Sequence, residues 1–200
     1  MGTAPDGAGI LIVACVLRSG GEYKPEHVTR LRAQVFDVVP DARFVCLSDV
    51  AVDCERVNLV HNWAGWWSKI ELFRPGLFDE PVIYLDLDTD VVADFSEMER
   101  GPLTMCRHFF EPDLVGSGVM AWGEDLSYLY ETFKASPERH VDQCRVKECW
   151  GDQGFISKHY RGKPDVFWSE VVSHKLECAD GVPDGAKIVA YHGRPKPWDV

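Results

Sequence analysis

The sequence PVIYLDLDTD at residues 81–90 joins an apolar run to three aspartates. The apolar run has the length and the residue types of a buried β-strand. Ligands of α/β proteins bind at the carboxyl ends of the strands, which is where Asp86, Asp88 and Asp90 begin. Side chains two residues apart in an extended segment share a face, so Asp86 and Asp88 point the same way. We therefore expect a ligand site at the end of this strand.

The pair of Asp86 and Asp88 indicates the kind of ligand. Two carboxylates held side by side repel each other unless a cation or a proton lies between them. Mn²⁺ and Mg²⁺ prefer such oxygen ligands and often share them with phosphate groups of a substrate. The sequence therefore predicts a divalent metal site here. The alternative is a solvated acidic turn that binds nothing.

Apolar runs of strand length alternate with amphipathic segments around this stretch. Further strands are expected at residues 9–16, 43–47, 56–60, 103–107, 118–122 and 187–191. Helices are expected from Pro25 to about residue 38, and at residues 66–72, 126–133 and 151–160. Strands that alternate with helices indicate an α/β sandwich with a mainly parallel central sheet.

The composition is that of an ordinary globular protein. The chain has 200 residues, of which 46% are hydrophobic, and its formal net charge is −11 at pH 7. A chain of this length buries roughly 70% of its unfolded surface, so we expect a single domain over residues 1–200. The acidic balance disfavours a general binder of nucleic-acid backbones, because such proteins need a clustered basic face. Arg139, His140, Arg145 and Lys147 form a modest cationic stretch, interpreted as a solvated helix face, with an anionic partner as the alternative.

Targeting signals are weak. No stretch approaches the roughly 18 apolar residues of a membrane span, and the first apolar run lacks the basic start of a signal peptide. The seven cysteines are scattered, which favours reduced thiols over a disulfide framework. We therefore expect no membrane span and a cytoplasmic location, and the sequence predicts no oligomeric state.

The segment YHGRPKPW at residues 191–198 follows the last expected strand. Pro195 and Pro197 restrict the backbone on both sides of Lys196. A cation held in this way could stabilise negative charge on a departing diphosphate, and His192 could complete a metal shell. The alternative for this segment is a frayed tail.

The acidic and the terminal motif, taken in order, resemble those of the GT-A glycosyltransferases. Asp86-Leu87-Asp88 resembles the DxD motif of that fold. Residues 192–198 resemble the terminal HxGxxKPW element of glycosyltransferase family eight, the glycogenin and galactosyltransferase group of retaining enzymes. His192 is followed directly by Gly193, one residue tighter than in some members.

Three further segments resemble the same family. GSGVM at residues 116–120 resembles its NSG-V segment, and GDQG at residues 151–154 resembles its DQ segment. Lys69 lies upstream of the DxD strand, where the family carries a lysine that contacts phosphate. The five elements together cover residues 10–198. One departure is Gly116, which stands where the family has asparagine.

The resemblance implies a nucleotide-sugar donor, most often UDP-linked, and a Mn²⁺ or Mg²⁺ ion. It implies that residues 9–100 form a nucleotide-binding half and residues 101–200 a half for sugar and acceptor. The implied metal ligands are Asp86, Asp88 and His192. The implied donor-binding residues are Val16, Arg18, Tyr23, Lys69, Asp86, Leu87, Ser117, Gly118, Gly193 and Lys196. The implied catalytic residues are Asp152, Gln153 and Lys196.

The acceptor and the competing functions stay open. A glycan or lipid-linked saccharide, a protein, a metabolite and DNA with 5-hydroxymethyl pyrimidines are all candidate acceptors. The aromatic cluster of Trp63, Trp66 and Trp67 is interpreted as core, with stacking on a sugar, base or acceptor as the alternative. One competing function is a phosphatase of the haloacid dehalogenase type that uses Asp86 and Asp88. Another is a sugar-nucleotide binding module without catalysis.

Overall fold

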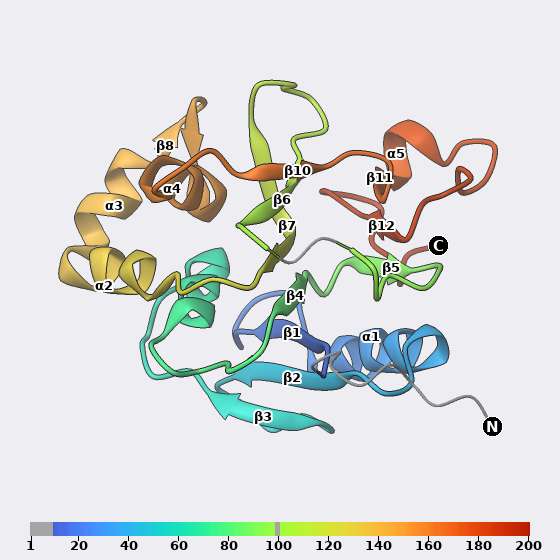
Figure 1. Cartoon of the computed structure of the whole chain (residues 1–200), viewed down its shortest axis with the longest axis horizontal. Helices are drawn as coiled ribbons and strands as arrows, with labels where there is room; N and C mark the ends of the chain where they lie inside the picture. Colours follow the sequence, from blue (N-terminus) through green and yellow to red (C-terminus); the bar gives the residue numbers. More distant parts are fainter. Residues whose placement is uncertain (1–9, 99–100) are drawn as a thin grey trace.

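The computed structural model describes residues 10–98 and 101–200 and is built around a central sheet of seven strands (Figure 1). The strands lie in the order β10-β6-β7-β4-β1-β2-β3. They are β1 (Ile12–Leu17), β2 (Arg43–Ser48), β3 (Glu55–Asn58), β4 (Val82–Leu85), β6 (Thr104–Arg107), β7 (Val115–Trp122) and β10 (Asp165–Phe167). All neighbouring pairs are parallel except those that β7 forms with β4 and β6. The predicted mainly parallel sheet is confirmed.

Six helical elements and two small sheets complete the described chain. The helices are α1 (Pro25–Val38), the 3₁₀ helix η1 (Gly65–Phe73), α2 (Ser127–Ala135), α3 (Pro137–Gln143), α4 (Gly151–His159) and α5 (His174–Glu177). One small sheet contains β11 (Val171–Ser173), β12 (Ile188–Ala190) and β5 (Thr89–Val91). The other is the hairpin of β8 (Arg145–Val146) and β9 (Cys149–Trp150). In Figure 1, α2, α3 and α4 gather at one end of the molecule, and α1 lies at the other.

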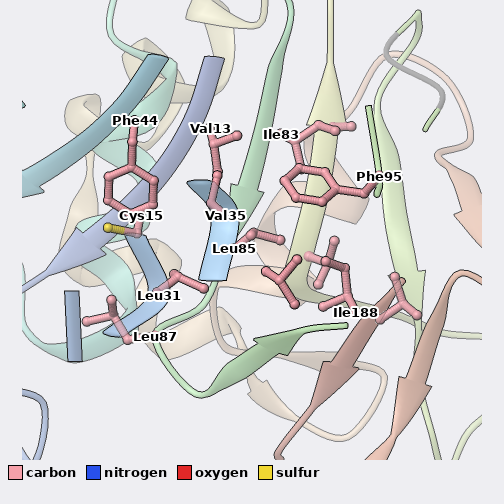
Figure 2. Close-up of a cluster of buried hydrophobic side chains, with 14 of the residues drawn as sticks. Val13, Cys15, Leu31, Val35, Phe44, Ile83, Leu85, Leu87, Phe95 and Ile188 are labelled. Carbon is pink, nitrogen blue, oxygen red and sulfur yellow. The ribbon is translucent and has the colours of Figure 1, made fainter. Parts of the chain in front are cut away.

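Hydrophobic clusters cover both faces of the central sheet. On one face, Val13 and Cys15 of β1 pack with Leu31 and Val35 of α1 (Figure 2). On the other face, the alternate β1 residues Ile12 and Ala14 belong to a cluster that includes side chains of η1, α2 and α4. Because side chains of a strand alternate between faces, a strand buried on both sides must be apolar throughout. This explains the unbroken apolar run near the N-terminus.

The strand expected at residues 9–16 is β1, which begins three residues later and ends one residue later; Gly9, the first residue of the expected strand, lies outside the described residues. The expected helix at residues 66–72 is a 3₁₀ helix in which residues 67–73 are all buried. The helices expected at Pro25 and at residues 151–160 are confirmed.

The cationic stretch expected on one helix face is divided between two elements. Arg139 and His140 lie on α3, whereas Arg145 and Lys147 lie in the hairpin. None of the described helices is both long enough and apolar enough to cross a membrane. The division into two halves stays a prediction, although strands from both share the central sheet.

Candidate active site

A cavity of about 830 Å³ opens where β1 and β4 end. Nearly all the predicted site residues line it, although they come from positions 16 to 196 of the chain. They are Val16, Arg18, Tyr23, Lys69, Asp86, Asp88, Ser117, Gly118, Asp152, Gln153, His192 and Lys196. Leu87 and Gly193 do not line the cavity. The Leu87 side chain packs into the core beneath α1, and Gly193 is an exposed turn residue with φ of +76°.

Lys69 of η1 lies at the centre of a buried polar network. Its ammonium is 2.9 Å from Asp152 Oδ2, 2.9 Å from Ser117 Oγ and 3.4 Å from Asp86 Oδ1. Ser117 Oγ in turn donates to Asp152 Oδ2 at 2.7 Å. Burial alone would lower the pKa of Lys69, but Asp152 and Asp86 raise that pKa above its usual value. Lys69 is therefore a buried charged group whose charge is compensated by Asp152 and Asp86.

Asp86 is the first carboxylate after β4. The hydroxyl of Tyr84 donates a short hydrogen bond to it, and the Asp86 backbone N–H donates to Gly118 O on β7 at 2.8 Å. Burial raises the pKa of Asp86 to about 6, against the lowering effect of Lys69. Burial also raises the pKa of Tyr84, so the phenol keeps its proton and remains a donor. Burial therefore disfavours the charged form of the Asp86 carboxylate, and a nearby cation favours it.

Asp88 contacts the C-terminal segment. Lys196 Nζ lies 2.5 Å from Asp88 Oδ2, and the Tyr23 hydroxyl donates to the same oxygen at 2.9 Å. The backbone N–H of Tyr191 donates to Asp88 O at 3.0 Å. Lys196 is only 5% exposed. The terminal segment is therefore an ordered wall of the cavity and not a frayed tail.

His192 lies in the same cavity but does not join the two aspartates. Its Nε2 is 2.6 Å from Ser173 Oγ, and its ring stacks on Phe109. Burial lowers the pKa of His192, which favours a neutral imidazole. Within residues 10–98 and 101–200, no group of three or more His, Cys, Asp or Glu side chains is arranged to hold a metal ion. The predicted metal ligands Asp86, Asp88 and His192 therefore line the same cavity, but they are not grouped as a metal site among the described residues.

Arg18 and Tyr23 follow β1 and form another part of the wall. Arg18 Nη1 is 3.2 Å from Asp49 Oδ2, and its guanidinium donates a short hydrogen bond to Asn62. Ser19 Oγ donates to Asp49 at 2.6 Å. Ser19 and Asn62 line the cavity and were not predicted. They lie in loops without periodicity, so the sequence carries no local signal for them.

Three exposed aromatic rings also line the cavity. Trp66, Trp150 and Phe110 are 51%, 52% and 61% exposed. The interpretation of the Trp63–Trp67 cluster as core is correct for Trp67, which is buried, but not for Trp66. Gly151 adopts φ of +61°, and a Cβ on it would lie 3.1 Å from Trp66 Nε1. The start of α4 therefore packs closely against the Trp66 indole.

Gly116 has a packing reason for its departure from the family's asparagine. A Cβ at this position would lie 2.9 Å from Cys106 Sγ on the neighbouring strand β6. The register of β6 against β7 shifts between Met105 and Cys106, which brings the sulfur toward the glycine. A side chain at position 116 would therefore require the Cys106 side chain to move.

Comparisons with known proteins agree with this architecture. No family model matches the sequence, and no curated protein matches it. Among solved structures, galactosyltransferase LgtC in complex with donor and acceptor sugar analogs superposes with a TM-score of 0.65 at 15% identity, over 94% of this chain and 89% of LgtC. The apo form of glycosyltransferase GlyE from Streptococcus pneumoniae TIGR4 superposes with a TM-score of 0.69 at 13% identity, over 95% of this chain and 56% of GlyE. The chain has the GT-A fold that these glycosyltransferases share.

Proposed function

We propose that this chain is a glycosyltransferase that moves a sugar from a nucleotide-diphosphate donor, most simply a UDP-sugar, to a hydroxyl acceptor. The observation that carries the proposal is the pair of buried cations, Lys69 and Lys196, which meet Asp86, Asp88 and Asp152 in one cavity. The cavity volume of about 830 Å³ suits a bound small molecule. The cavity also lies at the strand ends, where α/β proteins bind ligands.

Lys196 would stabilise the leaving diphosphate. Its ammonium is buried against Asp88 and Tyr23, so the surroundings are poor in water and little reorganisation is needed when charge develops nearby. A preorganised cation in such a site lowers the barrier to breaking the bond between the sugar and the diphosphate oxygen. Lys69, which lines the same cavity, would assist, with its position set by Asp152 and Ser117.

The donor set fits Mn²⁺ or Mg²⁺. Asp86 and Asp88 offer carboxylate oxygens, and within the described chain no hydrogen bond reaches Asp88 Oδ1. The three carboxylates outnumber the two ammonium groups that contact them, which favours a further cation. Ser173 contacts Nε2 of His192, so His192 would contribute through Nδ1, or through Nε2 after giving up that hydrogen bond. A bound metal supplies Lewis-acid stabilisation of negative charge on phosphate oxygens.

Asp152 and Gln153 would face the sugar. Asp152 is 5% exposed, and both Lys69 and Ser117 contact its Oδ2. This arrangement fixes the carboxylate at the start of α4, beside the cavity. We favour transfer with retention by front-face displacement, in which the leaving diphosphate takes the proton of the acceptor hydroxyl. Asp152 is then an electrostatic and positioning group, and the residue to test first as a nucleophile.

The surroundings of the cavity favour a saccharide acceptor over a polyanion. Trp66 and Trp150 present apolar ring faces, which suit stacking on a sugar ring. Two cations of the nearby stretch already have acidic partners, because Lys147 pairs with Glu111 at 2.7 Å and Arg145 with Asp142 at 3.1 Å. A DNA acceptor would need unpaired cations along its backbone.

The proposal is tested by ligand-induced stabilisation. UDP, GDP, ADP and CDP are each added with and without Mn²⁺, and the thermal midpoint is measured for the wild type and for Lys196→Met. We expect one nucleotide to raise the midpoint in a metal-dependent way, with a smaller rise in the variant. Turnover of the matching nucleotide sugar is then measured. No metal-dependent stabilisation by any of the four would refute the proposal. Hydrolysis of a generic phosphoester without turnover of nucleotide sugars would favour the phosphatase instead.

A further inference from the structure

The thiols of Cys144 and Cys149 meet at the base of the β8–β9 hairpin, and their sulfur atoms are 3.0 Å apart. Both cysteines are free. A disulfide bond is about 2.05 Å long, so a shift of about 1 Å is enough to join them. We propose that Cys144 and Cys149 are a modification site that closes reversibly into an intramolecular disulfide.

The backbone around the two thiols is already held in place. Cys144 N donates to His140 O at 3.0 Å at the end of α3, and Gly151 N donates to Cys144 O at 2.9 Å. Cys149 pairs with Val146 across the hairpin. The contact between the two sulfur atoms therefore lies within a hairpin whose backbone is fixed by hydrogen bonds.

Helix α4 also packs against the hairpin. A Cβ on Gly154 would lie 2.5 Å from the carbonyl carbon of Cys149, so the helix contacts the hairpin backbone directly. Because α4 packs against Cys149 and the end of α3 holds Cys144, the two cysteines have little room to move apart. We expect closure of the disulfide to need side-chain movement alone, because these contacts hold the backbone on both sides.

Thiol–disulfide exchange with a low-molecular-weight disulfide such as glutathione disulfide provides a balanced route. The thiolate of the half-buried Cys149 attacks one glutathione sulfur, forms a mixed disulfide and releases the first glutathione thiolate. Cys144 then attacks the Cys149 sulfur, loses its proton and releases the second glutathione. Two protein thiols are oxidised, and one glutathione disulfide is reduced to two glutathione thiols.

The order of the two steps follows from burial. Cys144 is 4% exposed, and burial together with the neighbouring Cys149 thiol raises the pKa of Cys144 to about 12. Cys144 is therefore the poorer first nucleophile, because the thiolate is the reactive form. It attacks second, when its target is already bonded to the adjacent sulfur.

The disulfide would act on the surroundings of the cavity. Trp150, which lines the cavity, directly follows Cys149 and pairs with Arg145 across the hairpin. Asp152 lies two residues further, in the first turn of α4. Closure would restrict the hairpin that carries the Trp150 ring. The inference concerns the thiols themselves and does not depend on the proposed transferase activity.

Tryptic mapping tests the proposal, because Arg145 and Lys147 lie between the two cysteines. The folded protein is incubated with glutathione disulfide, then denatured in the presence of N-ethylmaleimide to block every free thiol, and digested without reduction. We expect residues 140–145 to be recovered joined to residues 148–158, at least about tenfold more than after dithiothreitol treatment.

Cys178→Ser is the matched control, since Cys178 is another partly exposed thiol, and this variant should form the link as the wild type does. Cys149→Ser should lose it. Recovery of both cysteines as maleimide adducts after oxidation would overturn the proposal. Glutathione that stays on Cys149 without a link to residues 140–145 would overturn it as well.

Discussion

Lys69 is a charged side chain inside the protein, 6% exposed and in contact with two carboxylates. Removing one partner of a buried ion pair leaves an uncompensated charge, which costs about 3–5 kcal/mol. Lys69→Met should therefore lower the free energy of unfolding by about this amount. The double variant Lys69→Met, Asp152→Asn should lose at least about 1 kcal/mol less, because the amide removes the stranded charge.

Urea denaturation of the two variants measures this coupling. The control is Lys134→Met, whose ion pair with Glu131 is about half exposed and whose loss should change the free energy by less than about 0.5 kcal/mol. Equal losses in the single and the double variant would mean that Lys69 and Asp152 do not compensate each other in solution.

Lys196 and Arg194 are two cations of the same segment with different surroundings. Lys196 lines the cavity, whereas Arg194 is exposed and pairs with Glu22 and Asp199. If Lys196 stabilises a leaving diphosphate, Lys196→Met should lower kcat/KM for the nucleotide sugar by roughly 100- to 1,000-fold. Arg194→Met should stay within about threefold of the wild type. A similar loss in both variants would assign the effect to disorder of the segment and not to the charge.

At the scale of elements, close packing rather than helix propensity decides the residue at position 154. Ala is normally about 1 kcal/mol more favourable than Gly within a helix. A Cβ at Gly154 of α4 would nevertheless lie 2.5 Å and 2.7 Å from two backbone atoms of Cys149, which cannot rotate away. Gly154→Ala should therefore destabilise the protein by about 1–3 kcal/mol in chemical denaturation.

Gly21→Ala is the control, because a Cβ there would meet nothing within 4 Å. Its free energy of unfolding should differ from that of the wild type by less than about 0.5 kcal/mol. A Gly154→Ala variant as stable as this control would show that α4 and the hairpin are not packed as described.

Elements with a long periodic pattern were predictable, whereas most of the very short ones were not. The apolar spacing of Val28, Leu31 and Val35 predicts α1, and the observed helix buries these same side chains. β5, β10 and β11 have three residues each, too few to show any periodicity. β12 is equally short but was predicted, because it lies within the apolar run at residues 187–191. These short strands form because they pair with strands that are distant in sequence. For example, β5 pairs with β12, which lies about 100 positions further along the chain. The hairpin of β8 and β9 was missed for the same reason.

At the scale of the whole molecule, the candidate site is assembled from segments that are far apart in sequence. Lys196 and Asp88 are 108 positions apart, and Lys196 and Tyr23 are 173 positions apart. Local patterns identify an acidic strand end and a stiff basic segment but cannot bring them together, so only the resemblance to a family predicted that they share a site. Trp150 and Phe110 belong to no recognised motif and to no periodic apolar pattern, so the sequence did not identify them as residues of the site. The net charge of −11 describes the whole surface, whereas the polar wall of the cavity is a local balance of acids and lysines.

The contact between the C-terminal segment and α1 can be observed through His27, which is 8% exposed. Its ring stacks on Trp198 with a centroid distance of 3.7 Å and an interplanar angle of 5°. Its Nδ1 accepts a hydrogen bond from the Lys24 N–H, which a protonated Nδ1 cannot do. Burial lowers the pKa of His27 below its usual value. The neutral ring therefore stabilises the fold above about pH 6.5, and this contribution is lost as the pH falls through the lowered pKa.

Trp198→Ala should uncover the imidazole and move the pKa of His27 back toward its usual value. NMR titration should show this upward shift, and the free energy of unfolding should fall less steeply between about pH 7 and pH 5 in the variant than in the wild type. His140 on α3 is the internal control, since its contacts are with Phe133, Phe155 and His159, and its titration should be the same in both proteins. If the His27 titration does not change, Trp198 does not cover the ring in solution. The terminal segment that carries Lys196 would then not be held against α1 by this stack.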